Sequence, residues 1–326
     1  MAITERYVTA AATGGGDGTS GSPWTIYEGF DSLSGGYRLN IKSDSDYILT
    51  SNLTFTNAGT ATSPSHVRGY SDTLGDGGRI NISGGDYGFL LDTEYHYFEN
   101  LNITTSGSPS TLSGGSSAGY LNFNKCSFAH TDGSTTLSFN FADKTAILNN
   151  CYVEANTGRP IFSDSFLTLN CCTTKNIGFE YFGHVESKRG IAAYNCVFDA
   201  SGNYRVVDLD RLGVFSKCTF LNGADGLYHA FGYWLLVTDC IFYNMTGDAI
   251  SLSGNTNTPS ECLISNNAMG AITGDRVDGF NDNEELNPIV LTEDPFVDSI
   301  NKNYTLNNAP GGGALCKGSA LTPPSS

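Results

Sequence analysis

Positive charge is scarce in this chain of 326 residues. Lysine and arginine total 17 against 33 aspartate and glutamate residues, which gives a formal net charge of −16. A surface of that sign repels the phosphates of nucleic acids and of anionic lipids, so we expect neither nucleic acid nor a membrane as a partner. Only 15% of the residues are charged, whereas 39 are glycine, and this composition favours strands joined by many turns.

Long apolar runs are also missing. No stretch approaches the roughly 18 apolar residues of a membrane-spanning helix. The opening residues 1–6 run into a Gly/Thr-rich segment without the apolar core of a secretory signal, so we expect a protein made without export. We expect no cofactor, and no metal either, because neither a Cys-x-x-Cys pair nor a histidine partner recurs with the cysteines.

Cysteine is present nine times, and seven of the cysteines recur at a regular spacing. Consecutive members lie 21 to 25 residues apart, which indicates a structural repeat rather than a disulfide framework. The seven are Cys126, Cys151, Cys172, Cys196, Cys218, Cys240 and Cys262. We predict that they stack as small buried side chains in successive coils, with no cross-link because adjacent coils hold them roughly 5 Å apart.

The residues around each cysteine repeat as well. An apolar residue lies three positions before it in most coils, as at Phe123, and a bulky or β-branched one lies two positions after it, as at Phe128. The pair between, here Asn124-Lys125, predicts a two-residue corner, because Asn and Asp tolerate left-handed backbone angles. Four positions after the cysteine, a partial asparagine stack is predicted from Asn176, Asn222, Asn244 and Asn266.

The same frame extends upstream without cysteine. Leu101 fits the cysteine position one coil before Cys126, and Ile80 and then Leu53 fit it in the two preceding coils. The sequence therefore predicts an all-β chain that forms a right-handed parallel β-helix of about ten coils of roughly 22 residues. We expect residues 1–35 to form an N-terminal cap, residues 36–285 the β-helix, and residues 286–326 a C-terminal cap and tail, because a solenoid end must be covered.

Three stretches carry a resemblance to a known family. They are Tyr7-Val8-Thr9 with Gly18–Thr25, the repeated Asn-bearing corners followed by Phe, and Asp294–Asp298 with Tyr304–Leu306. In these the chain resembles the pectin-lyase-like superfamily of parallel β-helix proteins, including virion-associated proteins of the phage tailspike type. The resemblance implies the fold, but not one function, because this scaffold carries lyases, hydrolases, tailspikes and structural proteins.

One group of chemically versatile side chains lies 7 to 13 residues before the cysteine position on neighbouring coils, and the next coil adds a histidine and two aromatics. The group is His184, Glu186, Lys188, Arg189, Arg205, Asp208, Asp210, Arg211, His229, Tyr233 and Trp234. Equal offsets predict that Glu186 stacks on Asp208 and Arg189 on Arg211. An ion-pair patch, a glycan-binding surface and an acid–base site for glycan cleavage all fit these residue types.

The composition leaves three functions open. We expect first a structural virion component of a tailed bacteriophage, either a capsid-decorating protein or a short tail appendage. Its partners would be other virion proteins and a cell-surface polysaccharide, and it could form a homotrimer. The alternative is a secreted pectate-lyase-like polysaccharide lyase or glycoside hydrolase that acts on an extracellular glycan. The third is an adhesin that binds glycan through the same patch without turnover.

Overall fold

The computed structural model describes residues 3–57, 59–91, 93–107, 112–114, 119–131, 139–141, 144–156, 161–163, 166–176, 185–187, 189–200, 205–229, 234–252, 262–278, 285–301 and 303–321. The chain divides into two compact units. Unit 1 comprises Met1–Thr157 and Ile161–Ser165, and unit 2 comprises Gly158–Pro160 and Phe166–Ser326.

Unit 1 contains three parallel sheets, named here in the order in which the chain visits them. Sheet 1 contains β1 (Thr4–Val8), β2 (Tyr37–Lys42), β5 (Ser65–Tyr70), β8 (His96–Glu99), β11 (Gly119–Asn124) and β14 (Lys144–Asn149). Sheet 2 contains β3 (Tyr47–Ile48), β6 (Ile80–Gly85), β9 (Leu101–Thr105), β12 (Ser127–His130) and β15 (Tyr152–Ala155). Sheet 3 contains β4 (Leu53–Phe55), β7 (Phe89–Leu91), β10 (Leu112–Gly114), β13 (Phe139–Phe141) and β16 (Ile161–Ser163).

Unit 2 repeats the same three sheets. Its sheet 1 contains β17 (Phe166–Asn170), β20 (Gly190–Tyr194), β23 (Leu212–Ser216), β26 (Leu235–Thr238) and β29 (Cys262–Ser265). Its sheet 2 contains β18 (Thr173–Asn176), β21 (Val197–Asp199), β24 (Thr219–Leu221), β27 (Ile241–Met245), β30 (Ala268–Ile272) and β32 (Ile289–Val290). Its sheet 3 contains β19 (Val185–Ser187), β22 (Val207–Leu209), β25 (Leu227–His229), β28 (Ile250–Ser251) and β31 (Val277–Asp278).

Each coil runs through sheets 1, 2 and 3 in turn and then stacks on the coil before it. Strands that neighbour each other in a sheet are parallel and one coil apart, as in the pairs β5–β8 and β23–β26. Alternate residues of a strand point inward, so that Leu121 and Phe123 of β11 are fully buried while Asn122 between them is not. This arrangement is the predicted right-handed parallel β-helix, which the structure confirms.

The corner between sheets 1 and 2 has the predicted left-handed backbone. From the coil of β8 onward, one residue at each corner has a φ of 52–59°: Asn100, Lys125, Asn150, Cys171, Asn195, Lys217, Asp239, Asn266 and Asn287. The residue after it turns inward, and where it is cysteine its thiol donates to the carbonyl two positions earlier, as in Cys196 to Tyr194 at 3.3 Å. The corner therefore lets an apolar residue before it and a cysteine after it share one interior.

The cysteine column is confirmed for six of the seven members. Cys126 and Cys151 are buried in unit 1, and Cys172, Cys196, Cys218 and Cys240 are buried in unit 2, all as free thiols.

The prediction for Cys262 was wrong. This residue lies in β29 of sheet 1 opposite Leu235 and is half-buried, while Asn267 occupies the cysteine position and accepts a hydrogen bond from the Cys240 amide at 2.9 Å. This coil is longer than the cysteine-bearing coils before it, so a cysteine that follows at the usual interval falls one strand early. Asn266 consequently lies at the corner between sheets 1 and 2. Asn222 and Asn244, by contrast, stack where the chain leaves sheet 2, through a 2.7 Å hydrogen bond.

The register predicted for the three coils before Cys126 is correct for two of them. Ile80 lies opposite Leu101 in sheet 2, as predicted. Leu53 is different, because it belongs to β4 of sheet 3 and lies opposite Phe89. In sheet 2 this coil contributes β3 instead, whose Tyr47 lies opposite Ile82, two residues after the cysteine position.

A short helix, α1 (Ile26–Asp31), packs at the N-terminal end of unit 1. Thr25 and Glu28 form a capping box that satisfies amides at its first turn. Phe30 of this helix is buried and lies edge-to-face against Phe55 of β4, with ring centroids 4.9 Å apart. This helix therefore covers the apolar interior at that end of unit 1.

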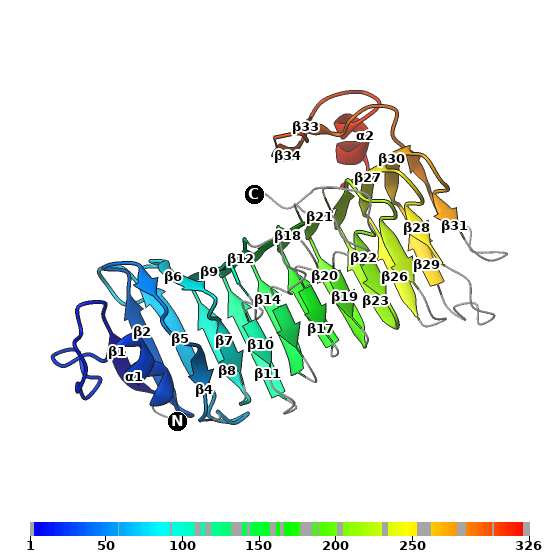
Figure 1. The fold of residues 1–326 in the computed structure, drawn as a ribbon. Helices are drawn as coiled ribbons and strands as arrows, with labels where there is room; N and C mark the ends of the chain where they lie inside the picture. Colours follow the sequence, from blue (N-terminus) through cyan, green and yellow to red (C-terminus); the bar gives the residue numbers. More distant parts are fainter. Residues whose placement is uncertain are drawn as a thin grey trace. The chain divides into compact units, whose positions relative to one another are not determined.

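The C-terminal segment of unit 2 covers the outer face of sheet 2. After β32, the hairpin of β33 (Phe296–Asp298) and β34 (Asn303–Leu306) and the helix α2 (Gly313–Gly318) lie beside β27 and β30 (Figure 1). Phe296 and Leu306 pack on the outward side chains Val197 and Ile241 of sheet 2. Tyr304 donates a 2.6 Å hydrogen bond to buried Asp199. Neither helix of the described chain is long and apolar enough to cross a membrane.

The thiol environments predict a simple labelling pattern. Cys171 is exposed, whereas burial raises the pKa of half-buried Cys262 to about 11 and leaves little reactive thiolate. We expect Ellman's reagent to modify one thiol rapidly in the native protein, and Cys171→Ser to abolish this phase while Cys262→Ser preserves it. Rapid labelling that survives Cys171→Ser would contradict the buried column.

Candidate functional site

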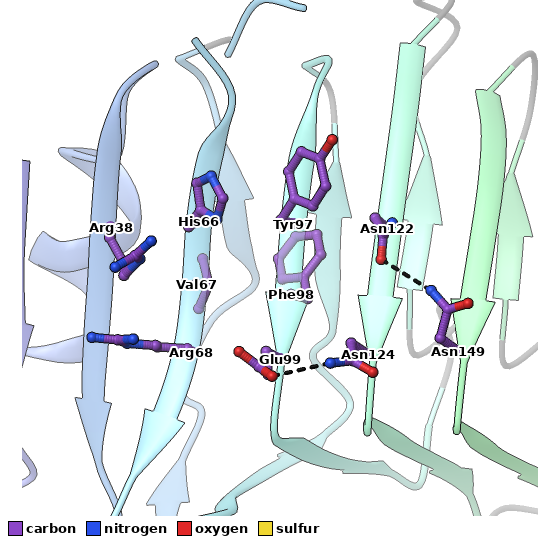
Figure 2. Close-up of a pocket in the computed structure, with 10 residues that line it drawn as sticks. All are labelled: Arg38, His66, Val67, Arg68, Tyr97, Phe98, Glu99, Asn122, Asn124 and Asn149. Atoms are coloured by element: carbon purple, nitrogen blue, oxygen red, sulfur yellow. Dashed lines mark hydrogen bonds between the residues drawn. The ribbon is translucent and has the colours of Figure 1, made fainter. Parts of the chain in front are cut away.

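A polar pocket of about 400 Å³ lies on the outer face of sheet 1 in unit 1. Its lining comes from β2, β5, β8, β11 and β14 (Figure 2). Outward side chains from five successive coils therefore form one continuous surface. The size falls within the usual range of small-molecule and oligomer sites.

The register of the coils arranges these side chains in two rows that run across the strands. The first, called the His66 row, contains Arg38, His66, Tyr97 and Asn122. The second, called the Arg68 row, contains Asn40, Arg68, Glu99, Asn124 and Asn149. Within each row the members are paired residues of adjacent parallel strands, so they stand roughly 4.8 Å apart along the coil axis.

Aromatic rings occupy the middle of the His66 row. The His66 and Tyr97 rings are stacked, with centroids 5.0 Å apart and an interplanar angle of 12°. Tyr120, from the next strand, lies 6.2 Å from Tyr97 at a tilt of 49°. Three aromatic rings therefore lie side by side on this face, where they can contact a ring-shaped ligand.

Two guanidinium groups lie at the β2 end of the pocket. Arg38 forms an ion pair with Glu5 at 3.1 Å, and Arg68 extends toward β2, where its Nε donates to Asn40 Oδ1 at 2.6 Å (Figure 2). The second Arg68 contact to Glu5 is long, at 3.9 Å. Asn40 is fully buried and also donates to Glu5 at 2.7 Å. The single carboxylate of Glu5 is therefore the ion-pair partner of both guanidinium groups.

The opposite end of the pocket is lined by amides and one carboxylate. Asn124 Nδ2 donates to Glu99 Oε1 at 3.0 Å, and Asn149 Nδ2 lies 3.4 Å from Asn122 Oδ1 (Figure 2). The amide groups offer both donors and acceptors to a neutral hydroxyl-rich ligand.

His66 is half-buried between the two cations. Burial, and then the charges of Arg38 and Arg68, lower the pKa of His66 below its ordinary value of 6.5. The imidazole is therefore neutral at pH 7, with a free lone pair on one ring nitrogen. A neutral imidazole flanked by guanidinium groups can accept a proton while the cations stabilise developing negative charge.

The patch predicted from the sequence lies on sheet 3 of unit 2, and the structure describes only part of it. Glu186 lies opposite Asp208, which confirms the predicted stacking of their strands, and Asp208 lies opposite Tyr228. The described residues do not include His184, Lys188 or Tyr233.

Arg205 is the centre of the described part of that patch. Its guanidinium lies 3.2 Å from the Asp208 carboxylate and 3.7 Å from that of Asp225, and it covers the Tyr228 ring. Its charge is thus compensated within the patch. Three other members of the predicted patch are exposed to solvent: Arg189, Arg211 and Trp234. Asp210 is half-buried.

His229 does not lie on the predicted surface. It points into the coil, with 2% of its surface exposed, and its Nε2 bonds to the Arg211 carbonyl at 2.6 Å. The reason is the register, because His229 lies opposite Leu209, an inward position of sheet 3. Within the described ranges, no group of three or more His, Cys, Asp or Glu side chains is placed to share a metal ion.

Sequence reasoning missed the pocket of unit 1. All of its residues except Asn149 precede the first cysteine, and the intervals between its coils vary, since His66 and Tyr97 are 31 residues apart and Tyr97 and Asn122 are 25 apart. A usable signal existed, because both His66-x-Arg68 and Tyr97-x-Glu99 place an aromatic ring two residues before a charge on successive strands.

Known structures share this fold. No protein-family model and no curated protein matches the chain. Pectate lyase Pel9A is similar over 89% of this chain and 77% of its own, at 13% identity and a TM-score of 0.53. A GH136 lacto-N-biosidase from Eubacterium ramulus is similar at 11% identity over 88% of this chain and 67% of its own, with a TM-score of 0.42. The PL6 family lyase Pedsa3628 from Pseudopedobacter saltans is similar at 10% identity over 90% and 87%, with a TM-score of 0.38. The likeness to Pel9A shows a pectin-lyase-like parallel β-helix.

The charges around His66 predict how its titration responds to substitution. Arg68→Gln removes a nearby cation, so we expect the pKa of His66 to rise toward 6.5, whereas Glu99→Gln should lower it further. An NMR titration of the imidazole protons measures both shifts, with His66→Gln identifying the resonance and Lys217→Gln, in unit 2, as the control. A pKa that is unchanged in both variants would rule out this arrangement of charges.

Proposed function

We propose that this protein binds a polysaccharide along the outer face of sheet 1 in unit 1. The observation that carries the proposal is the stacked His66–Tyr97 pair with guanidinium groups on one side and amides on the other. Aromatic faces stack on the apolar faces of sugar rings, while arginine and asparagine bond to hydroxyl and carboxylate groups.

The form of the pocket also supports a polymer as the ligand. Its two rows cross five strands, so it extends for roughly 19 Å along the coil axis, which is longer than one sugar ring. The likeness of the fold to pectate lyase Pel9A adds support, because the name of that protein assigns it to polysaccharide cleavage. A glycan-binding surface also suits the predicted virion component, whose partner would be a cell-surface polysaccharide.

The stacking surface predicts a specific loss of binding. Tyr97→Ala removes one face of the aromatic pair, and we expect affinity for the retained glycan to fall at least tenfold, about 1.4 kcal/mol. A glycan array, followed by isothermal titration with the best ligand, provides the measurement. Tyr194→Ala is the matched control, because Tyr194 is exposed on sheet 1 of unit 2. Equal loss in both variants, or no retention of any glycan, would refute the proposal.

A second candidate function is β-elimination of a uronide, which the lowered pKa of His66 favours. The neutral imidazole would take the proton from the carbon next to the sugar carboxylate. The electron pair released would form a carbon–carbon double bond as the neighbouring glycosidic carbon–oxygen bond breaks, and the leaving oxygen would take a proton from solvent. Arg38 and Arg68 would stabilise the negative charge that develops on the carboxylate.

Catalysis predicts a reaction product that binding alone does not. We expect incubation with acidic polysaccharides to yield unsaturated uronides, detected by ultraviolet absorbance, and His66→Gln to lower the rate at least a hundredfold. Activity should fall as acid protonates His66, at a pH below the ordinary histidine value of 6.5. The same yield from His66→Gln as from the parent would exclude this role, and binding without any product would leave the protein an adhesin.

A further inference from the structure

We infer that the groove selects a polysaccharide of mixed charge, with an anionic residue at its β2 end and neutral residues toward β14. This inference rests on the proposed binding function and names the ligand class of the same site. It follows from an uneven distribution of charge along the two rows.

The β2 end carries one uncompensated positive charge. Arg38 and Arg68 are both partly buried, with 25% and 17% of their side-chain surface exposed, and Glu5 is the carboxylate that both approach. Arg38 holds it at 3.1 Å, and Asn40 donates to its other oxygen at 2.7 Å. Arg68 makes its short contact to the neutral Asn40 amide instead. A ligand carboxylate at this end gains a charge-assisted hydrogen bond.

The middle of the Arg68 row has the opposite sign. Glu99 stands next to Arg68 in the register but bonds to Asn124, away from the cations. The Glu99 carboxylate therefore keeps its negative charge in the groove, with a neutral amide as its hydrogen-bond donor. A second ligand carboxylate over β8 would meet a like charge in a partly desolvated groove, which costs binding energy. From there to β14 the row offers only amides, which suit hydroxyl or acetamido groups.

The two ends are too far apart for one sugar to contact both. The step from β2 to β11 covers three strand spacings, roughly 14 Å, so different residues of one glycan chain contact the cationic and the amide ends. A fully acidic polymer satisfies the first end and is repelled at Glu99. A neutral polymer leaves Arg68 without its anionic partner. A chain that contains both kinds of residue satisfies the whole groove.

Homogalacturonan supplies matched probes, because methyl esterification neutralises its carboxylates without changing the backbone. We expect isothermal titration to give at least tenfold tighter binding for the half-esterified polymer than for the fully acidic or the fully esterified one. Tightest binding by either uniform polymer overturns the inference, as does the absence of binding to all three. Retention on the glycan array with loss in Tyr97→Ala would still support the proposed function in those cases.

Two substitutions test the assignment of each end. Arg68→Gln should reduce binding of the half-esterified polymer about tenfold and leave the fully esterified one unchanged, because only the anionic contact is lost. Glu99→Gln should strengthen binding of the fully acidic polymer about tenfold, because the repulsion is removed. Lys217→Gln, at an exposed corner of unit 2, is the charge-matched control. Circular dichroism confirms folding, and equal effects of both variants on all three polymers overturn the inference.

Discussion

Parallel hydrogen bonding between successive coils is the constraint on which the rest of this structure depends. It sets each residue of a strand opposite one residue of the next coil, and the two-residue periodicity of a strand then assigns that pair to the interior or to the surface. The same register that stacks Phe198, Phe220 and Phe242 inside unit 2 aligns His66 with Tyr97 outside unit 1. Within unit 1, where Phe98 stacks on Phe123 in the interior, core and candidate site are two faces of the same sheet.

The corners make this ladder possible. An interior with three sheets requires sharp bends, and at the first bend a single residue in the left-handed region is sufficient. Asparagine and aspartate adopt that region at low cost, but Lys125, Cys171 and Lys217 adopt it too. Because the amides of all three bond to carbonyls of the following coil, as Lys125 does to Asn149, the stack holds these less suited residues in place.

The sequence predicted the parts of the fold that repeat locally and failed where the repeat changes length. The cysteines and their flanking apolar residues defined the sheet 1–sheet 2 corner, since both lie within a few residues of each other. The prediction failed at Cys262 because its coil is longer than the preceding cysteine-bearing coils. A constant spacing between cysteines placed Cys262 at the position that Asn267 occupies. The groove was missed for the same reason, because its first three coils, those of β2, β5 and β8, carry no cysteine and differ in length. No local pattern indicates that Tyr304 bonds to Asp199, 105 residues earlier.

Comparison of two arginines explains why the overlooked groove, rather than the predicted patch, is the better candidate. Arg205 has carboxylates at 3.2 Å and 3.7 Å and an aromatic ring beneath it, so a ligand anion would have to displace partners that already neutralise it. Arg68 has a neutral amide at 2.6 Å and reaches a carboxylate only at 3.9 Å. In a chain with a net charge of −16, a cation left available in this way requires a structural cause. That cause is Asn40, which takes Arg68 as a hydrogen-bond donor while leaving its charge to a ligand.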